Sequence, residues 1–188
     1  DGELWSTNRK GVVMRLPVEG ERLRTEQVSL FVGKGFVVTF QEVPGDCLNP
    51  VRDRIHRARG RTRSSGPDYL AYALIDAGID AFFPLVEQFA DRIESLEDLA
   101  VVGAGEDIPR EILGIRHDLL TLRRAVWPLR ETLSTLYRDE IEFIQQETQV
   151  YLRDCFDHTN QLIEVIESYH EMSGSLMEVY MTSVSNKM

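Results

Sequence analysis

The residues with the greatest potential for chemistry lie in the run 153–158, Arg-Asp-Cys-Phe-Asp-His. Asp154, Asp157 and His158 have the spacing i, i+3 and i+4, so a helix places them on one face. Two carboxylates and an imidazole can approach one divalent cation. The alternative is structural, because carboxylates with this spacing commonly pair with arginines of a neighbouring helix. The spacing alone favours that structural interpretation.

A further carboxylate is notable for its surroundings. Asp76 lies between Ile75 and Ala77 on a largely apolar predicted helix. Burying a carboxylate without a partner is costly, so this position requires one. An arginine is the more common partner, and a metal ion is the alternative.

Three polar residues near the end of the chain share one helical face. Glu178, Thr182 and Ser185 are spaced by four and then three residues. If several such helices assemble about an axis, this polar line would face a central water-filled pore. If they do not, the line faces solvent.

Motifs typical of enzymes are absent from the sequence. It has no nucleophile elbow, phosphate-binding loop, dinucleotide fingerprint or zinc-finger spacing. Gly103-Ala104-Gly105 reads as a turn between helices. The sequence therefore gives no support to an enzymatic function.

The charge is strongly negative, with a formal net charge of −10 over 188 residues. This balance argues against nucleic acid as a partner. Residues 51–63 carry six arginines, whereas residues 68–107 carry ten acids and one base. The arginine run is predicted to be a solvated helix face whose positive charge complements the acidic helix after it. A phosphate-binding patch is the alternative.

Cysteine content and hydropathy predict a soluble piece from a reducing compartment. Cys47 and Cys155 are the only cysteines and are expected to be buried thiols, although one disulfide between them stays possible. No run approaches the ~20 apolar residues of a membrane span.

The first part of the chain, 2–43, is predicted to be β-rich. Residues 27–32 and 36–40 flank a Gly-Lys-Gly turn and predict a hairpin, and 11–16 predicts another strand. Three strands make a thin sheet, so earlier strands are expected to be missing.

Helices are predicted from Asn49 onward. Asn49 is expected to cap a helix that ends near Arg63. A second helix is predicted from residue 67 towards 101, with a kink at Pro84. The acidic character noted above belongs mainly to this second helix.

A third helix, opened by Pro109, carries apolar residues at alternating steps of three and four from Leu119 to Leu136. Such a seam predicts packing against another helix, here as an α-hairpin with the second helix. Pro128 is expected to bend it.

The last stretch, 141–188, reads as one long helix without proline. Residues 148–188 alone would span about 60 Å, too far to bury against one small domain. No glycine cap or proline ends the helix, which predicts a stalk whose continuation is missing. The predicted fold class is α+β: a partial N-terminal β-sheet layered with helices, then a long α-hairpin and a long stalk helix.

Five short motifs follow one another in a characteristic order and spacing along the chain: Asp68–Asp76 (DYLAYALID), Trp127–Glu131 (WPLRE), Leu136–Asp139 (LYRD), Tyr151–His158 (YLRDCFDH) and Ser183–Lys187 (SVSNK). Together they resemble the CorA family of magnesium and cobalt channels. The resemblance runs from Glu26 to the end of the chain.

This resemblance implies a homopentamer in the cytoplasmic membrane, with divalent metal ions as its other partners. Residues 1–66 would be the C-terminal part of an N-terminal α/β domain, 67–140 a helical hairpin, and 141–188 a stalk leading towards an absent first membrane helix. The piece itself would be soluble, on the cytoplasmic face of the membrane. The family's Gly-Met-Asn loop would lie beyond it.

The resemblance also implies site residues. Asp154 matches the stalk carboxylate that binds regulatory Mg2+ between subunits, and Asp76 matches the carboxylate of a neighbouring second site. Glu178 matches an acidic position of the funnel towards the pore. Asp157 and His158 match the motif but are not expected to be primary ligands. A Glu-Asp pair from the missing N-terminal segment would complete the metal sites.

The implied function is sensing of intracellular Mg2+ to gate a pore for Mg2+, with Co2+ as a possible further ion. A zinc-transporting relative of the same superfamily is the close alternative, although the carboxylate-rich sites favour magnesium. A helical scaffold that binds no ion is the alternative from a different class.

Overall fold

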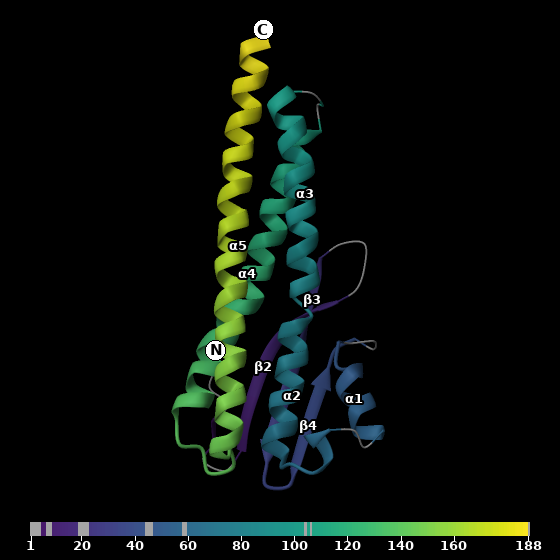
Figure 1. The fold of residues 1–188 in the computed structure, drawn as a ribbon, viewed down its shortest axis with the longest axis vertical. Helices are drawn as coiled ribbons and strands as arrows, with labels where there is room; N and C mark the ends of the chain where they lie inside the picture. Colours follow the sequence, from purple (N-terminus) through teal and green to yellow (C-terminus); the bar gives the residue numbers. More distant parts are fainter. Residues whose placement is uncertain are drawn as a thin grey trace. The chain divides into compact units, whose positions relative to one another are not determined.

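The computed structural model describes residues 5–6, 9–18, 23–43, 47–57, 60–103, 105 and 107–187. Its elements are β1 (Trp5–Ser6), β2 (Arg9–Val18), β3 (Arg24–Gly33), β4 (Phe36–Gln41), α1 (Asn49–His56), η1 (Arg61–Arg63), α2 (Pro67–Asp80), α3 (Phe83–Val102), α4 (Ile108–Arg138) and α5 (Gln146–Lys187). They form two compact units, the first from residues 1–82 and 125–160 and the second from 83–124 and 161–188. Helices α4 and α5 contribute to both units (Figure 1).

The sheet of the first unit is antiparallel, in the order β1-β2-β3-β4. The predicted hairpin is confirmed, because Gly33 pairs with Phe36 across a two-residue turn. Gly35 in that turn has φ of 92°, a conformation that favours glycine. A Cβ on Gly33 would lie 2.4 Å from the Phe36 ring, so any other residue there would require that exposed ring to move.

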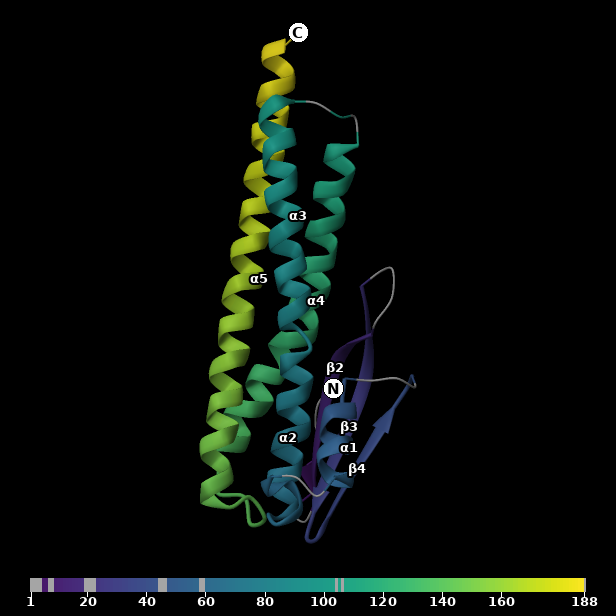
Figure 2. The same cartoon turned by 45° about the vertical axis from the view of Figure 1, so that its right-hand side comes forward.

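One face of the sheet packs against α2 and forms the core of the first unit. Strands β2 and β3 alternate, as expected for a half-buried sheet, and their inward side chains are Val12, Met14, Leu16, Val28, Leu30 and Val32. Gly78 of α2 allows close approach, since a Cβ there would lie 2.9 Å from Leu16. Figure 2 shows α2 beside the sheet. The fold is therefore α+β, as predicted.

The first predicted helix is shorter than expected. Helix α1 ends at His56, and Arg61–Arg63 form a separate 3-10 turn. Asn49 is not the N-cap: Leu48 holds that position, and the Asn49 side chain instead accepts a hydrogen bond from Arg52 at 2.9 Å. The Asn49 side-chain oxygen thus accepts from the Arg52 side chain and not from a backbone N–H of the first turn.

The second predicted helix is two helices. Helix α2 ends at Asp80 and α3 begins at Phe83. Pro84 has no N–H to donate to the Asp80 carbonyl, and its ring clashes with that carbonyl, which explains an interruption rather than a kink. The stretch Pro67–Val102 is long and apolar enough for a membrane span, but half of its most apolar window is buried inside the protein, so this is weak evidence for one.

The second unit consists of α3 with the adjoining parts of α4 and α5, which lie side by side in Figures 1 and 2. The predicted α-hairpin turns at Gly103 and Gly105, whose φ values are 55° and 102°; Ala104 lies outside the described residues. Arg92 and Asp118 join the two arms at 3.6 Å. The predicted seam is confirmed, since all its leucines and Val126 are buried.

Helix α5 begins at Gln146, five residues later than predicted. Ile141–Gln145 form a turn, in which the Ile144 N–H bonds to the Ile141 carbonyl. The helix starts where it does because Asp68 accepts hydrogen bonds from the Gln145 N–H at 3.1 Å and the Thr148 hydroxyl at 2.6 Å. A carboxylate from α2 therefore caps the N-terminus of α5.

Candidate functional site

Asp76 faces the N-terminal part of α5 within the first unit. Its Oδ1 accepts a hydrogen bond from the Cys155 thiol at 3.8 Å, and its Oδ2 accepts one from the Tyr72 hydroxyl at 3.5 Å. Both donors are neutral. Among the described residues Asp76 forms no ion pair with an arginine, so the more common partner expected from sequence is not present.

The surroundings of Asp76 disfavour additional negative charge. Burial raises the pKa of its carboxyl above the ordinary value, and Asp80, one turn further along α2, raises it again. The Cys155 hydrogen bond, His158 and Arg54 act in the opposite direction. Burial is the larger of the two effects, and the repulsion between the Asp76 and Asp80 carboxylates is the smaller.

Cys155 and Tyr72 stay protonated at neutral pH. Burial raises the pKa of each group strongly, and the nearby charge of Asp76 raises both further. Asp154 and Asp80 add to the effect on Cys155. Each group can therefore donate a hydrogen bond to Asp76 while staying neutral, so neither brings a positive charge to the carboxylate.

Asp154 is exposed on α5, next to the buried Cys155. Asp157 and His158 are also exposed, and His158 lies close enough to act electrostatically on Asp76. Neither aspartate forms an ion pair with an arginine among the described residues, so the structural interpretation that spacing favoured is not supported.

The described residues around Asp76 and Asp154 do not form a metal site by themselves. Within the described ranges, no three His, Cys, Asp or Glu side chains are grouped so that they could hold an ion. The structure thus brings Asp76 to the α5 segment that carries Asp154.

A tyrosine cluster supports the α2 side of this region. The rings of Tyr69, Tyr72 and Tyr151 lie with centroids 5.0 to 5.6 Å apart. Arg61 stacks over Tyr69 at 5.9 Å and donates to the Tyr151 hydroxyl at 3.0 Å. This packing holds the Tyr72 ring, and with it the hydroxyl that faces Asp76.

The arginines of residues 51–63 act on α2 and also on other elements. Arg54 lowers the pKa of Asp76 in α2. Arg61 pairs with Glu147 in the first turn of α5 at 3.3 Å, and Arg57, the C-cap of α1, pairs with Asp53 of α1 at 3.7 Å. Arg59 lies outside the described residues. These pairs are exposed and therefore contribute little stability.

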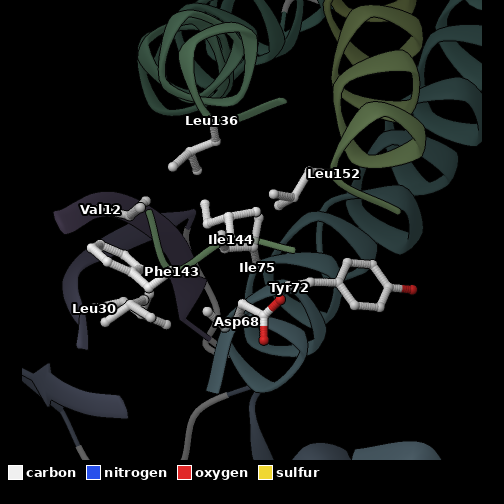
Figure 3. A pocket seen from close by; sticks show the side chains of 11 residues that line it. Val12, Leu30, Asp68, Tyr72, Ile75, Leu136, Phe143, Ile144 and Leu152 are labelled. Atoms are coloured by element: carbon white, nitrogen blue, oxygen red, sulfur yellow. The ribbon is translucent and has the colours of Figure 1, made fainter. Parts of the chain in front are cut away.

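Asp68 is a buried carboxylate that sequence reasoning missed. It is 3% exposed and borders a cavity of about 20 Å³, whose other lining residues are mainly apolar (Figure 3). Such a cavity has room for about one water molecule, so it is no substrate pocket. Both identified partners of Asp68 belong to the start of α5, which assigns the carboxylate a structural role.

The polar line lies in the second unit. Glu178, Thr182 and Ser185 are all exposed on α5. The Thr182 hydroxyl donates to the Glu178 carbonyl of its own helix at 2.9 Å. In a single copy the line faces solvent, and its placement along a pore stays a prediction.

The two cysteines are not joined. Cys155 is buried, as expected, whereas Cys47 is only partly buried. Because neither belongs to a disulfide, the thiol interpretation is confirmed for both.

Comparison with known proteins decides the family. The family described as CorA-like Mg2+ transporter protein matches residues 12–188. The chain belongs to the CorA family. The cobalt/magnesium transport protein CorA of Thermotoga maritima is 42% identical over 165 residues, which cover 88% of this chain and 47% of that protein. The putative metal ion transporter YfjQ of Bacillus subtilis is 35% identical, with coverages of 89% and 52%.

The chain therefore spans about half the length of these curated CorA-family relatives. The soluble domain of CorA from Methanocaldococcus jannaschii shares the fold, with a TM-score of 0.82, 18% identity and coverages of 95% and 72%. The cytoplasmic domain of ZntB from Vibrio parahaemolyticus does so too, with a TM-score of 0.76, 12% identity and coverages of 95% and 70%. At these identities the likeness establishes the fold alone.

Proposed function

We propose that this chain is the cytosolic regulatory domain of a CorA-like divalent cation channel, which senses Mg2+ at carboxylate sites between subunits. The observation that carries the proposal is Asp76, a half-buried carboxylate with two neutral donors, facing the α5 segment that bears Asp154. In a member of the CorA family, this arrangement suits a cation that neighbouring copies complete.

The donor chemistry favours magnesium. Mg2+ prefers oxygen ligands and keeps several of its waters, so one or two carboxylates per copy are sufficient. The exposed Asp154 can present a carboxylate to a neighbouring copy while Asp76 supports it from α2. Neighbouring copies would complete the site in a homopentamer of the full-length protein.

Gating follows from the same charges. A bound cation screens carboxylates that face one another across an interface and stabilises the closed assembly. When Mg2+ falls, repulsion between these carboxylates favours separation of the subunits and an open pore. The ion must bind the closed state more tightly for this to work, and moving an equilibrium from 1:99 to 99:1 requires about 5.5 kcal/mol in total. Glu178, Thr182 and Ser185 would then line the funnel towards the pore at the cytoplasmic face of the membrane.

One observation leads us to propose magnesium and cobalt, and not zinc, as the transported ions. The relative with 42% identity is named a cobalt/magnesium transport protein. The fold does not discriminate, because the ZntB cytoplasmic domain shares it. A transporter of this kind needs no catalytic residues, in agreement with the lack of enzyme motifs in the sequence.

The test is thermal unfolding of the full-length protein with increasing Mg2+. An ion at 100 times its dissociation constant stabilises the folded state by about 2.7 kcal/mol. We expect Asp154→Ala and Asp76→Ala to lose this stabilisation. Asp157→Ala is the matched control, exposed one turn further along α5, and should keep it. Stabilisation by zinc alone would favour the zinc-transporting alternative, and no response to any ion would favour a scaffold.

A further inference from the structure

The last turn of α3 exposes apolar side chains at the end of a helix that is otherwise acidic on its surface. Before this turn the helix carries five acids, all exposed, and one base. Leu99, Val101 and Val102 follow, with side chains that are 48%, 62% and 57% exposed. Single apolar residues on a surface are ordinary, whereas three within four positions form a patch of the kind that contacts a partner or a membrane. These three residues form an apolar tip.

The apolar tip is fixed to the C-terminal part of α5 within the second unit, where the two helices lie side by side (Figure 1). The Lys187 ammonium donates to the Val102 carbonyl. The Tyr180 hydroxyl donates to the Gly105 carbonyl at 3.1 Å. A Cβ on the intervening Gly103 would lie 3.1 Å from a side-chain atom of α5, so the turn packs closely on that helix. The tip therefore lies at the C-terminal end of α5 and shares its surroundings.

The end of α3 suits the boundary layer of a bilayer and not its hydrocarbon core. A helix leaves its last carbonyls without partners in the helix, and such groups are costly in hydrocarbon. Here the Ala100 carbonyl accepts from the Gly103 N–H at 3.0 Å. The Val102 carbonyl accepts from Lys187. The remaining carbonyls and the acids before the tip need water or lipid headgroups, which the boundary layer supplies next to the acyl chains.

We propose that the apolar tip of α3 contacts the boundary layer of the lipid bilayer on the side of the membrane that carries this domain. The inference rests on the proposed function, which puts the C-terminal part of α5 at that face of the membrane. The sequence supports a lipid surface as the occupant, since it holds no charge from residue 99 to residue 105. The contact would hold the α3–α4 hairpin at the membrane beside the funnel residues of α5.

The test places a small fluorescent label on the tip of the full-length protein in phosphatidylcholine vesicles. Leu99→Cys carries the label in a Cys47→Ser background, where the remaining thiol of this chain, Cys155, is buried and any cysteine outside it is replaced. Lipids with a nitroxide high on the acyl chain quench the label only at short range, so we expect quenching at Leu99. The matched control is a label at Val150→Cys, which is 60% exposed and lies about 55 Å before Lys187 along α5; it should not be quenched.

A second variant separates the tip from the label. Val101→Gln together with Val102→Gln removes the exposed apolar groups and keeps uncharged residues that favour a helix. Because the wild-type contact takes the exposed half of each valine out of water, we expect the double change to lower the ratio of bound to free tip by about tenfold or more. Quenching of the Leu99 label should fall with it.

Three results overturn the inference: a Leu99 label quenched no more than the Val150 label, a label whose emission shifts to the blue without quenching because another copy of the chain covers it, and quenching that the double glutamine change leaves unaltered. The proposed function fails separately, because its failure is a wild type that Mg2+ does not stabilise. Mg2+ stabilisation that depends on Asp154, together with no quenching at Leu99, would leave the regulatory proposal standing and remove the membrane contact.

Discussion

Loss of the contact between Asp68 and the start of α5 should lower the free energy of unfolding of the first unit. The carboxylate is 3% exposed and accepts from the Gln145 N–H and the Thr148 hydroxyl. Asp68→Ala removes the acceptor and leaves both donors without it. Loss of a helix cap costs about 0.5–2 kcal/mol, and a buried polar group left unsatisfied costs about 1–3 kcal/mol. We therefore expect a destabilisation of about 2–4 kcal/mol.

The assay is urea and thermal unfolding of the chain. For a protein of this size, each kcal/mol corresponds to about 2–4 °C, so the midpoint should fall by roughly 5–15 °C. Asp68→Asn keeps an oxygen acceptor and should lose less. Asp53→Ala is the matched control, since its carboxylate is exposed and its ion pair with Arg57, the C-cap of α1, is exposed too. It should change stability by less than about 0.5 kcal/mol.

A double-mutant cycle separates this contact from general damage. Thr148→Val removes the hydroxyl that donates at 2.6 Å. If the account is right, Asp68→Ala and Thr148→Val couple by more than about 0.5 kcal/mol. Additive effects, or a loss below 0.5 kcal/mol for Asp68→Ala alone, would refute the reasoning.

Two further predictions follow from local geometry and charge. Gly78→Ala should lower the free energy of unfolding by more than about 1 kcal/mol, because the new Cβ would lie 2.9 Å from the buried Leu16 side chain. Gly174→Ala should be neutral or raise that free energy by up to about 1 kcal/mol through helix propensity, since only the flexible end of Arg116 must move. The urea midpoints of the two variants test this contrast. Folding raises the pKa of Asp76 above its ordinary value of 3.8, so the folded state loses stability as the pH rises from that value through the folded pKa. Without metal, Asp76→Asn should therefore be more stable than the wild type at neutral pH, and the difference should vanish in acid. An equal difference at every pH would contradict this.

Local signals predicted most of the fold. The hairpin was evident because β-branched and aromatic runs flank a glycine-rich turn, and the register of β3 and β4 follows from that turn. The seam from Leu119 to Leu136 was predicted because helical burial repeats every three or four residues. Both patterns are carried by neighbours in sequence, so no knowledge of distant contacts was needed.

Features that depend on distant residues were not predicted. The start of α5 is determined by Asp68, which is 77 residues from Gln145 in sequence. The partners of Asp76 were expected to be charged, but one of them, Cys155, comes from a helix 79 residues away. A thiol donor has no sequence pattern of its own, and its role becomes visible only when α2 and α5 are placed together.

The central claim is that Mg2+ regulates the full-length protein through Asp154 with support from Asp76. The most direct test is divalent-ion flux through the full-length protein in lipid vesicles as Mg2+ is raised on the side that carries this domain. We expect the flux to fall with Mg2+ in the wild type and in Asp157→Ala but to stay high in Asp154→Ala. Closure of Asp154→Ala at the same Mg2+ concentration as the wild type would contradict the central claim.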